Sequence, residues 1–352
     1  RPVKLDVAIV GAGFAGAATA FHLLRSGFSG TVGVFEREEL PGVHASGLNA
    51  SLVRQSEENP AIRRMMVDSV AAYRELAQEV GFSQVGSYLI GTRADLELLR
   101  DPQLIPAEWV TAQEICSCIP LLEGHRFEVG LWTPGDGVMD IARLLQFYLE
   151  GVRAGGGTVR FEAKVKAIEK TSEGFRLQVG GENIAATVVV NAAGAWAGEV
   201  AKLAGAVPPS MTAFKRHLFI LEDVGPLDPR RPFVWNVSDG FYFRPESGGL
   251  LFCICDEIPY EKDFIPTVES DVYDRLVEKV TGRLPRLEKA RVRKVWAGFR
   301  VKTPHGGFCI GPAEDVTGFF WVAGLGGHGM GASWAVGRVA AEGIVSAYFG
   351  ES

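Results

Sequence analysis

The chain has few cysteines, and their spacing excludes the common structural zinc sites. Its 352 residues include two C-x-C pairs and one further cysteine: Cys116 with Cys118, Cys253 with Cys255, and Cys309. C-x-C is a poor spacing for tetrahedral zinc ligands. An odd number of thiols in a chain without a signal-peptide pattern favours reduced cysteines over a disulfide framework. We therefore predict no metal site and a reducing, cytoplasmic location.

Long apolar runs are also missing. The best candidate for a membrane span, Asp6–Phe21, is interrupted by glycines and falls short of the roughly 18 to 20 apolar residues that cross a bilayer. An excess of positive charge is lacking too, because 36 Lys and Arg face 42 Asp and Glu, for a net charge of −6. The sequence therefore predicts no transmembrane segment and no nucleic acid partner.

A glycine-rich stretch near the N-terminus carries the strongest signal. Asp6–Val10 (DVAIV) has the composition of a buried strand, and residues 11–16 read GAGFAG. Ala17–Ser26 then alternates small and apolar residues at helical spacing, and Thr31–Phe35 predicts a second strand. Strand, G-x-G-x-x-G, helix and strand in this order form the fingerprint of a dinucleotide-binding βαβ unit.

Each residue of this fingerprint has a physical role. Gly11 permits a tight turn, Gly13 lets a pyrophosphate approach the backbone, and Gly16 lets the helix pack closely on the strand. The free N–H groups and positive dipole at the start of the helix favour phosphate. Glu36, twenty residues after Gly16, ends the second strand, where its carboxylate can accept hydrogen bonds from ribose hydroxyls.

The rest of the chain alternates predicted helices and strands. Helices are predicted at 60–80, Thr111–Ile119, Ile141–Ala154, Ser270–Val280 and 331–348. Strands are predicted at Ser87–Thr92, Thr158–Ile168, Phe175–Val179, Val295–Arg300, Gly307–Gly311 and Phe319–Ala323. The apolar run Ala185–Trp196 predicts a parallel strand that is covered on both faces.

The composition changes between Met211 and Glu257. Short aromatic-rich segments separated by turn formers (FKRHLFIL, FVWNV, GFYFRP and LLFCICDE) predict an antiparallel sheet. The sequence therefore predicts an α/β fold of two domains. A Rossmann-like nucleotide-binding domain takes residues 1–84, 141–208 and 295–352, and an inserted, mainly antiparallel domain takes 85–140 and 209–294.

Four further motifs make the chain resemble a known family. They are HASGLNAS at 44–51, NAAGAW at 191–196, WAGFRVKTPHGGFCIGP at 296–312 and FFWVAGLGGHGMGASWAVG at 319–337. With the N-terminal fingerprint, they resemble the D-amino-acid oxidase-like flavoproteins, which include glycine oxidase, sarcosine oxidase and D-arginine dehydrogenase. The spacing is most similar to that of D-arginine dehydrogenase. The resemblance spans nearly the whole chain and implies FAD as cofactor, an FAD-binding domain and an inserted substrate domain.

The implied FAD site draws on distant parts of the chain. The N-terminal unit would hold the AMP half, and the helix that begins near Gly331 would point its positive end at the flavin. Cys309 follows the position at which some relatives link flavin covalently, so we expect it to pack in the fold and FAD to bind non-covalently. The predicted cofactor-binding residues are Gly11, Gly13, Phe14, Ala15, Gly16, Glu36, Arg37, His44, Ala45, Ser46, Gly47, Asn49, Ala50, Val165, Ala192, Ala193, Gly194, Trp196, Gly298, Arg300, Gly326, Gly327, His328, Gly329 and Met330.

The resemblance also implies which residues carry the chemistry. It places Arg300 and Tyr242 over the flavin as a clamp for a substrate carboxylate, with Arg216 and His44 as further catalytic candidates. A guanidinium binds a carboxylate through two hydrogen bonds, and a tyrosine hydroxyl adds a third. The clamp would set the substrate Cα hydrogen against flavin N5, and hydride transfer would give an imino acid that water hydrolyses to a 2-oxo acid.

Other interpretations of these residues stay open. Tyr242 lies between aromatic residues in GFYFRP, which also fits a core position, and Arg216 stands in a basic stretch that also fits a surface. His44 and His328 either titrate during the reaction or only hydrogen-bond the cofactor.

Two absences narrow the predicted reaction. Sarcosine oxidases use a lysine to promote reaction with oxygen, and the corresponding strand, Gly249–Asp256 (GLLFCICD), has none. D-Arginine dehydrogenase binds a cationic tail with a carboxylate, and the comparable stretch, Val85–Gly91 (VGSYLIG), has no acid. We therefore predict FAD-dependent oxidative deamination of an amino acid with a neutral side chain, a D-amino acid or a small secondary amine, with electrons passed to an acceptor other than oxygen.

Three alternative functions stay open. The first is a glycine- or sarcosine-type oxidase that makes hydrogen peroxide. The second is an FAD-dependent 2-hydroxy-acid dehydrogenase, because related folds use the same clamp on an alcohol. The third is a flavin-binding subunit of a larger complex with little activity of its own.

Overall fold

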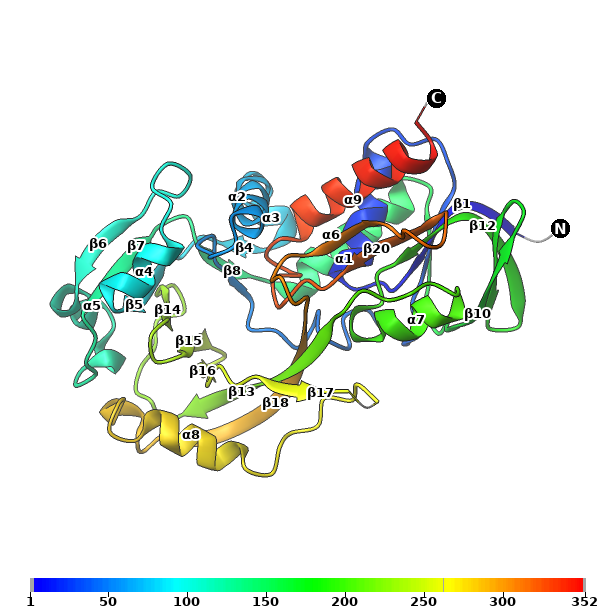
Figure 1. Cartoon of the computed structure of the whole chain (residues 1–352). Helices are drawn as coiled ribbons and strands as arrows, with labels where there is room; N and C mark the ends of the chain where they lie inside the picture. Colours follow the sequence, from blue (N-terminus) through cyan, green and yellow to red (C-terminus); the bar gives the residue numbers. More distant parts are fainter. Residues whose placement is uncertain (1–2, 262, 351–352) are drawn as a thin grey trace.

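The computed structural model describes residues 3–261 and 263–350. Within this part of the chain, one large sheet lies close to both termini and a second lies at the other end of the molecule (Figure 1). The first sheet is mostly parallel with helices packed on it, and the second is mostly antiparallel. This arrangement confirms the predicted fold class.

The first sheet contains the predicted βαβ unit. Helix α1 (Phe14–Arg25) joins β1 (Val3–Val10) to β2 (Val32–Phe35). Strand β1 lies between β2 and β12 (Glu182–Asn191) and pairs with both in parallel. The strand order is β10-β11-β12-β1-β2-β9, with β20 on β12 and β19 on β20. Its strands are β1 (Val3–Val10), β2 (Val32–Phe35), β9 (Thr158–Arg160), β10 (Val165–Thr171), β11 (Gly174–Val179), β12 (Glu182–Asn191), β19 (Cys309–Pro312) and β20 (Phe319–Ala323).

Helices cover both faces of this sheet. On one face α1, α2 (Pro60–Glu75), α6 (Ile141–Ala154) and α9 (Ser333–Tyr348) bury a core with Ile9 and Val190, and on the other α7 (Ala197–Leu203) packs on Val189. Helices α1 and α9 touch so closely that a Cβ on Gly337 would lie 2.6 Å from the backbone of Ala18. The valines of β12 are buried on both sides, as predicted for a covered parallel strand.

The second sheet holds most of the predicted antiparallel segments. Its order is β17-β13-β16-β15-β14-β5-β7-β6, with β18 paired to β13. Within the described part of this second sheet, β14 and β5 form the one parallel pair. Helix α8 (Val272–Val280) covers its outer face, where Leu276 packs with Phe219 and Phe252. The strands are β5 (Ser87–Gly91), β6 (Glu108–Thr111), β7 (Val129–Thr133), β13 (Thr212–Glu222), β14 (Phe233–Asn236), β15 (Phe241–Glu246), β16 (Gly249–Cys253), β17 (Ile258–Tyr260) and β18 (Arg291–Lys302).

Short elements connect the two sheets and close their ends. Helix α5 (Ala112–Cys118) begins with a capping box, in which the Thr111 hydroxyl accepts from the Glu114 N–H and the Glu114 carboxylate accepts from the Thr111 N–H. The remaining elements are α3 (Ala77–Val80), α4 (Arg93–Leu99), α5 (Ala112–Cys118), three 3-10 turns (Pro120–Leu122, Gly194–Trp196 and Pro285–Leu287) and a small sheet of β3 (Leu52–Val53), β4 (Phe82–Ser83) and β8 (Gly137–Met139). In the described part of the chain, no helix combines the length and apolar character that crossing a bilayer requires.

Two predicted elements and one predicted domain boundary differ from the structure. The helix predicted at 60–80 breaks at Leu76, which leaves α2 and the single turn α3. The strand predicted at 158–168 is two strands, because the chain turns at Glu162 (φ +49°), so that β9 pairs with β2 and β10 with β11. The predicted boundary at 294/295 falls inside β18, which pairs with β13 along its length. The domain division itself stays a prediction.

Asp136, beside the small sheet, makes a testable contribution to stability. Its fully buried carboxylate accepts hydrogen bonds from the Ser87 hydroxyl (2.7 Å) and from the backbone N–H (2.9 Å) and side chain (3.1 Å) of Gln55. Burial raises the pKa of Asp136 from 3.8 to about 6, against these hydrogen bonds. Between those pH values the folded state binds more protons than the unfolded state, so the free energy of unfolding falls as pH rises from about 4 to about 6.

We expect Asp136→Asn to remove this loss, because the amide keeps the shape and cannot ionise. A shift from 3.8 to about 6 corresponds to about 3 kcal/mol. Denaturant unfolding of both proteins from about pH 4 to about pH 7 measures the difference directly, since the other titrating groups are shared. If the free energy of unfolding changed with pH in the same way in both proteins, the raised pKa of Asp136 would be contradicted.

Candidate functional site

A cavity of about 890 Å³ lies between the two sheets. Part of its lining comes from the carboxyl ends of β1 and β2 and the start of α1, at Gly11–Phe14 and Glu36. Another part comes from the second sheet, which contributes Arg216, Tyr242 and Arg300. The two groups of predicted residues, far apart in the sequence, therefore face one continuous space.

Nearly all of the predicted site residues line this cavity. Those found in its wall are Gly11, Gly13, Phe14, Ala15, Glu36, Arg37, His44, Ala45, Ser46, Asn49, Ala50, Val165, Ala192, Ala193, Gly194, Trp196, Arg216, Tyr242, Gly298, Arg300, Gly326, Gly327, His328, Gly329 and Met330.

Two predicted cofactor residues, Gly16 and Gly47, are not in the wall. A Cβ on Gly16 would lie 1.9 Å from the Gly11 carbonyl oxygen, and one on Gly47 would lie 1.9 Å from the Gly42 carbonyl oxygen. Each glycine is therefore required for a backbone contact inside its own loop. They shape the loops that line the cavity, as predicted for the close packing at Gly16, and their place in the cofactor site stays a prediction.

The start of α1 has the geometry of a phosphate cradle. Gly11 has φ +106°, and a Cβ there would lie 2.5 Å from the Ala192 carbonyl oxygen. Gly13 precedes the helix and makes no side-chain cap, while the Ser46 hydroxyl, from the HASGLNAS loop, accepts from the Phe14 N–H at 3.1 Å. The helix therefore presents its positive end to the cavity between the two loops.

Glu36 is held in place at the end of β2. One of its carboxylate oxygens accepts from the Ala12 N–H (3.0 Å), and the other accepts from the Glu38 N–H (3.1 Å). These bonds leave further lone pairs on both oxygens. The fixed carboxylate beside the glycine turn fits the recognition of ribose hydroxyls.

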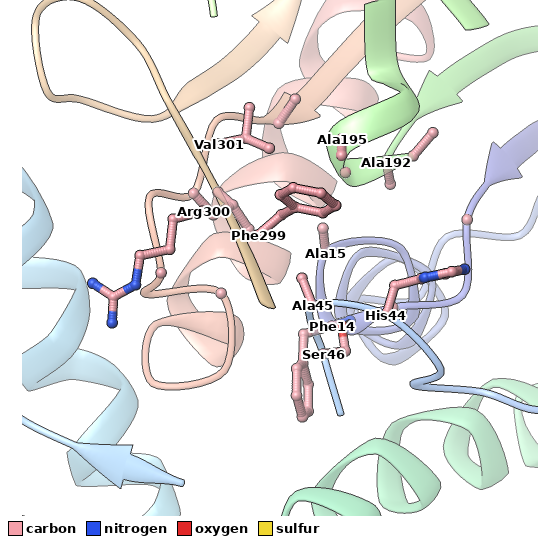
Figure 2. A pocket seen from close by; sticks show the side chains of 18 of the residues that line it. Phe14, Ala15, His44, Ala45, Ser46, Ala192, Ala195, Phe299, Arg300 and Val301 are labelled. Carbon is pink, nitrogen blue, oxygen red and sulfur yellow. Dashed lines mark hydrogen bonds between the residues drawn. The ribbon is translucent and has the colours of Figure 1, made fainter. Parts of the chain in front are cut away.

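A cluster of charged and aromatic side chains follows Glu36. The Arg37 guanidinium lies 3.8 Å above the Trp196 ring, and both Arg37 and the His44 Nε2 contact the same Glu38 oxygen at 2.8 Å. The His44 ring is 4.5 Å from that of Trp196. Figure 2 shows His44 and Arg300 extending to opposite sides of the view. His44 therefore belongs to this cluster, and the catalytic role predicted for it stays a prediction.

Within the described part of the chain, Arg300 is the arginine of the cavity wall that forms no ion pair with a carboxylate. Its guanidinium lies against Gly327, where a Cβ would be 2.9 Å from the Arg300 Cζ. Among residues 3–261 and 263–350, no carboxylate pairs with it, whereas Arg216 pairs with Glu257 at 2.7 Å. A guanidinium without a counter-ion in a cavity wall is suited to an incoming anion.

Tyr242 and Arg216 have further roles in the fold. The Tyr242 side chain is almost fully buried, and its ring stacks 4.3 Å from that of Trp235. Burial raises the pKa of Tyr242 well above its usual value, so its hydroxyl remains a hydrogen-bond donor. The Arg216 Nε donates to the Asp256 carbonyl oxygen at 3.1 Å in addition to its pairing with Glu257. The positive charge of Arg216 is thus largely compensated within the protein.

The sequence-based prediction missed a charged group in the wall. The Glu57 carboxylate pairs with the His328 Nε2 (2.7 Å) and with Arg54 (2.9 Å), whose guanidinium lies 4.1 Å above the Trp235 ring. Burial opposes ionisation of Glu57, but the hydrogen bond from His328 and the charge of Arg54 lower its pKa to about 2. The signal was an R-x-x-E pair, Arg54 and Glu57, separated from HASGLNAS by two residues.

Comparison with known proteins identifies the family. Residues 6–343 match the family described as "DAO: FAD dependent oxidoreductase". Human (Homo sapiens) mitochondrial dimethylglycine dehydrogenase is 27% identical over 382 residues, which cover 97% of this chain and 42% of that protein. Glycine oxidase from Geobacillus kaustophilus (strain HTA426) is 27% identical over 342 residues, which cover 91% of this chain and 88% of that protein.

A solved structure has the same fold. The structure of L-proline dehydrogenase from P. horikoshii superposes with a TM-score of 0.88 at 24% identity, over 98% of this chain and 94% of that one. The chain spans less than half of the length of dimethylglycine dehydrogenase.

The wall of the cavity fits FAD on its own geometry. The glycine turn and the start of α1 can donate backbone N–H groups to a pyrophosphate, and the Glu36 carboxylate beside them can accept hydrogen bonds from ribose hydroxyls. The same cavity continues to the glycine loop at 326–329 before α9. The chain therefore belongs to the DAO family of FAD-dependent oxidoreductases, with FAD as its cofactor.

Proposed function

We propose that this protein is an FAD-dependent dehydrogenase that oxidises a small amino acid with a neutral side chain, either a D-amino acid or a secondary amine. The observation that carries the proposal is the Arg300 guanidinium, which lies in the cavity wall without a carboxylate partner among the described residues. The relatives add support, because glycine oxidase, dimethylglycine dehydrogenase and L-proline dehydrogenase are all named for amino acids or an N-methylated amino acid.

The chain's own side chains would bind and orient the substrate. Arg300 holds the carboxylate through two parallel N–H···O bonds, and the protonated Tyr242 hydroxyl donates a third. With the carboxylate fixed, the Cα–H bond can point in fewer directions. Such positioning substantially lowers the free-energy barrier to transfer of the Cα hydrogen. Bound FAD supplies the two-electron acceptor that amino-acid side chains lack. Loss of the Cα hydrogen with its electron pair leaves an imino acid, and water hydrolyses it to a 2-oxo acid.

A neutral substrate side chain follows from the charges in the wall. Glu57 is already paired with Arg54 and His328, and Glu38 is paired with Arg37. Trp235 and Leu218, which also line the cavity, offer apolar surface. A cationic side chain placed beside Glu57 and Trp235 would lose its hydration without gaining a free carboxylate, so the similarity in spacing to D-arginine dehydrogenase does not extend to a proposed arginine substrate.

The proposed electron acceptor is a molecule other than oxygen, since β16 carries no lysine. The main competing function is that of an oxidase, which the likeness to glycine oxidase over 88% of that protein favours. A flavin-binding subunit is a second competing function, because the chain spans only part of dimethylglycine dehydrogenase. Cys309 is absent from the cavity wall, in keeping with non-covalent FAD, and the five free thiols are in keeping with a cytoplasmic location.

An anaerobic screen of flavin absorbance tests this proposal. The purified protein with FAD bound is mixed without oxygen with D- and L-amino acids, N-methyl amino acids and 2-hydroxy acids. We expect small neutral amino acids to bleach the flavin band and admission of air to restore it slowly. Rapid peroxide formation in air would overturn the dehydrogenase assignment. Bleaching by a hydroxy acid alone would indicate a 2-hydroxy-acid dehydrogenase, and bleaching by no compound would indicate a flavin-binding subunit.

A further inference from the structure

Three positive side chains share one face of two paired strands. Arg216 on β13 lies opposite Gly298 on β18, and Arg300 and Lys302 follow Gly298 along β18 at steps of two residues. Residues opposite each other in a sheet, and residues two apart on a strand, lie on the same face. All three cations line the cavity. The wall beside the proposed clamp therefore holds more positive charge than one substrate carboxylate requires.

One carboxylate, that of Glu257, pairs with two of these cations. Its Oε1 accepts from the Arg216 Nη2 at 2.7 Å and from the Lys302 Nζ at 2.5 Å. Burial opposes ionisation of Glu257, but the hydrogen bond from Lys302 and the charge of Arg216 lower its pKa, so it is a carboxylate at neutral pH. Glu257 is not itself in the cavity wall. It thus compensates Arg216 and Lys302 without occupying the space in front of them.

Arg216 and Lys302 are also held by contacts other than Glu257. The Arg216 Nε donates to the Asp256 carbonyl oxygen at 3.1 Å, and the Arg216 side chain is only 8% exposed. The Lys302 Nζ lies 5.6 Å from the centre of the Phe214 ring. If the charge of Glu257 were removed, both cations would remain in the wall with donors available to an anion.

We propose that Glu257 restricts this cavity to amino acids with a single carboxylate. While Glu257 is ionised, a second substrate carboxylate would lose its hydration beside Arg216 and Lys302 without gaining an unpaired cation. The inference rests on the proposed function, because Arg300 is taken as the group that binds the first carboxylate. Glu257 thereby excludes acidic side chains, for which the wall would otherwise offer two cations.

Binding of two acids with the same chain length tests this role without turnover. Butyrate carries one carboxylate and succinate carries two, and calorimetric titration of the oxidised protein with FAD bound gives both dissociation constants at fixed ionic strength. In the wild type, butyrate should bind at least as tightly as succinate. In Glu257→Gln we expect the dissociation constant of succinate, relative to that of butyrate, to fall by about tenfold or more, because its second carboxylate gains charged donors.

Glu246→Gln is the matched control for this change. Glu246 lies at the end of β15 in the same sheet and pairs with the buried Arg244, but neither residue lines the cavity. The control therefore also removes a carboxylate from a buried arginine, and it reports what a lost ion pair does to the fold alone. The ratio of the two dissociation constants should stay at its wild-type value.

Lys302→Gln changes the charge of the wall in the opposite direction. The Lys302 side chain is 36% exposed, so the fold should tolerate the change, and succinate should bind more weakly relative to butyrate than in the wild type. The inference is overturned if the ratio is unchanged in Glu257→Gln or, should that variant not fold, in Lys302→Gln. Equal butyrate binding by the wild type and Arg300→Ala would overturn the clamp, whereas tighter succinate binding in Glu257→Gln would still support the role of Glu257.

Discussion

Replacing Arg300 with alanine is expected to lower kcat/KM, for the amino acid that bleaches the flavin, by between about 30-fold and a few thousandfold. Removing one partner of a desolvated, hydrogen-bonded charge pair costs about 2 to 5 kcal/mol, and each 1.4 kcal/mol is a factor of ten. The loss should be this large because Arg300 is the arginine of the cavity wall that the protein leaves without a counter-ion among the described residues. Steady-state kinetics with matched flavin content measure it.

Two further variants make the Arg300 result specific. Arg300→Lys keeps the charge but loses the two-pronged geometry, so its kcat/KM should lie between those of the alanine variant and the wild type. Arg293→Ala changes the same residue type on the same strand, at an exposed position whose guanidinium bonds the Ser247 carbonyl oxygen, and it should leave kcat/KM unchanged. Unchanged turnover in Arg300→Ala would refute the clamp and support a flavin-binding subunit.

Gly16→Ala is expected to abolish retention of FAD and to lower the free energy of unfolding by about 3 kcal/mol or more. The added Cβ would lie 1.9 Å from the Gly11 carbonyl oxygen and 3.2 Å from the Ile9 side chain. The obstructing atom belongs to the backbone, so α1 must move away from the glycine turn, and overpacking of this kind is at the severe end of single substitutions. Flavin absorbance per protein after purification, with denaturant unfolding, reports both effects.

Gly198→Ala is the matched control for this change. Gly198 lies in α7 with no heavy atom within 4 Å of the added Cβ. Alanine is favoured over glycine inside a helix by about 0.5 to 1 kcal/mol, so this variant should be as stable as the wild type or more so. Normal FAD content in Gly16→Ala would show that the glycine turn tolerates a shifted helix.

Local patterns explain what could be predicted from the sequence. The βαβ fingerprint and helix α6 depend on residues close together in the chain, and the structure confirms both. The lining of the cavity could also be named, because four ordered motifs each supply a contiguous piece of wall. Such segments have a preferred structure before any long-range contact forms.

What could not be predicted depends on contacts between distant residues. Glu57 and His328 form a pair although they are 271 positions apart in the sequence, and no local periodicity predicts such a pair. The break at Glu162 arises because β9 and β10 join different neighbours, although the residues of both favour strands.

The tight contact between α1 and α9 has a consequence for how the chain is made. A ribosome completes α1 (Phe14–Arg25) long before it reaches α9 (Ser333–Tyr348), yet Gly337 and Ala18 must touch in the finished fold. Until then part of the apolar surface of α1 has no permanent cover, and surface of that kind attracts other unfinished chains. The core of the nucleotide-binding half therefore cannot close on α1 until synthesis has passed α9.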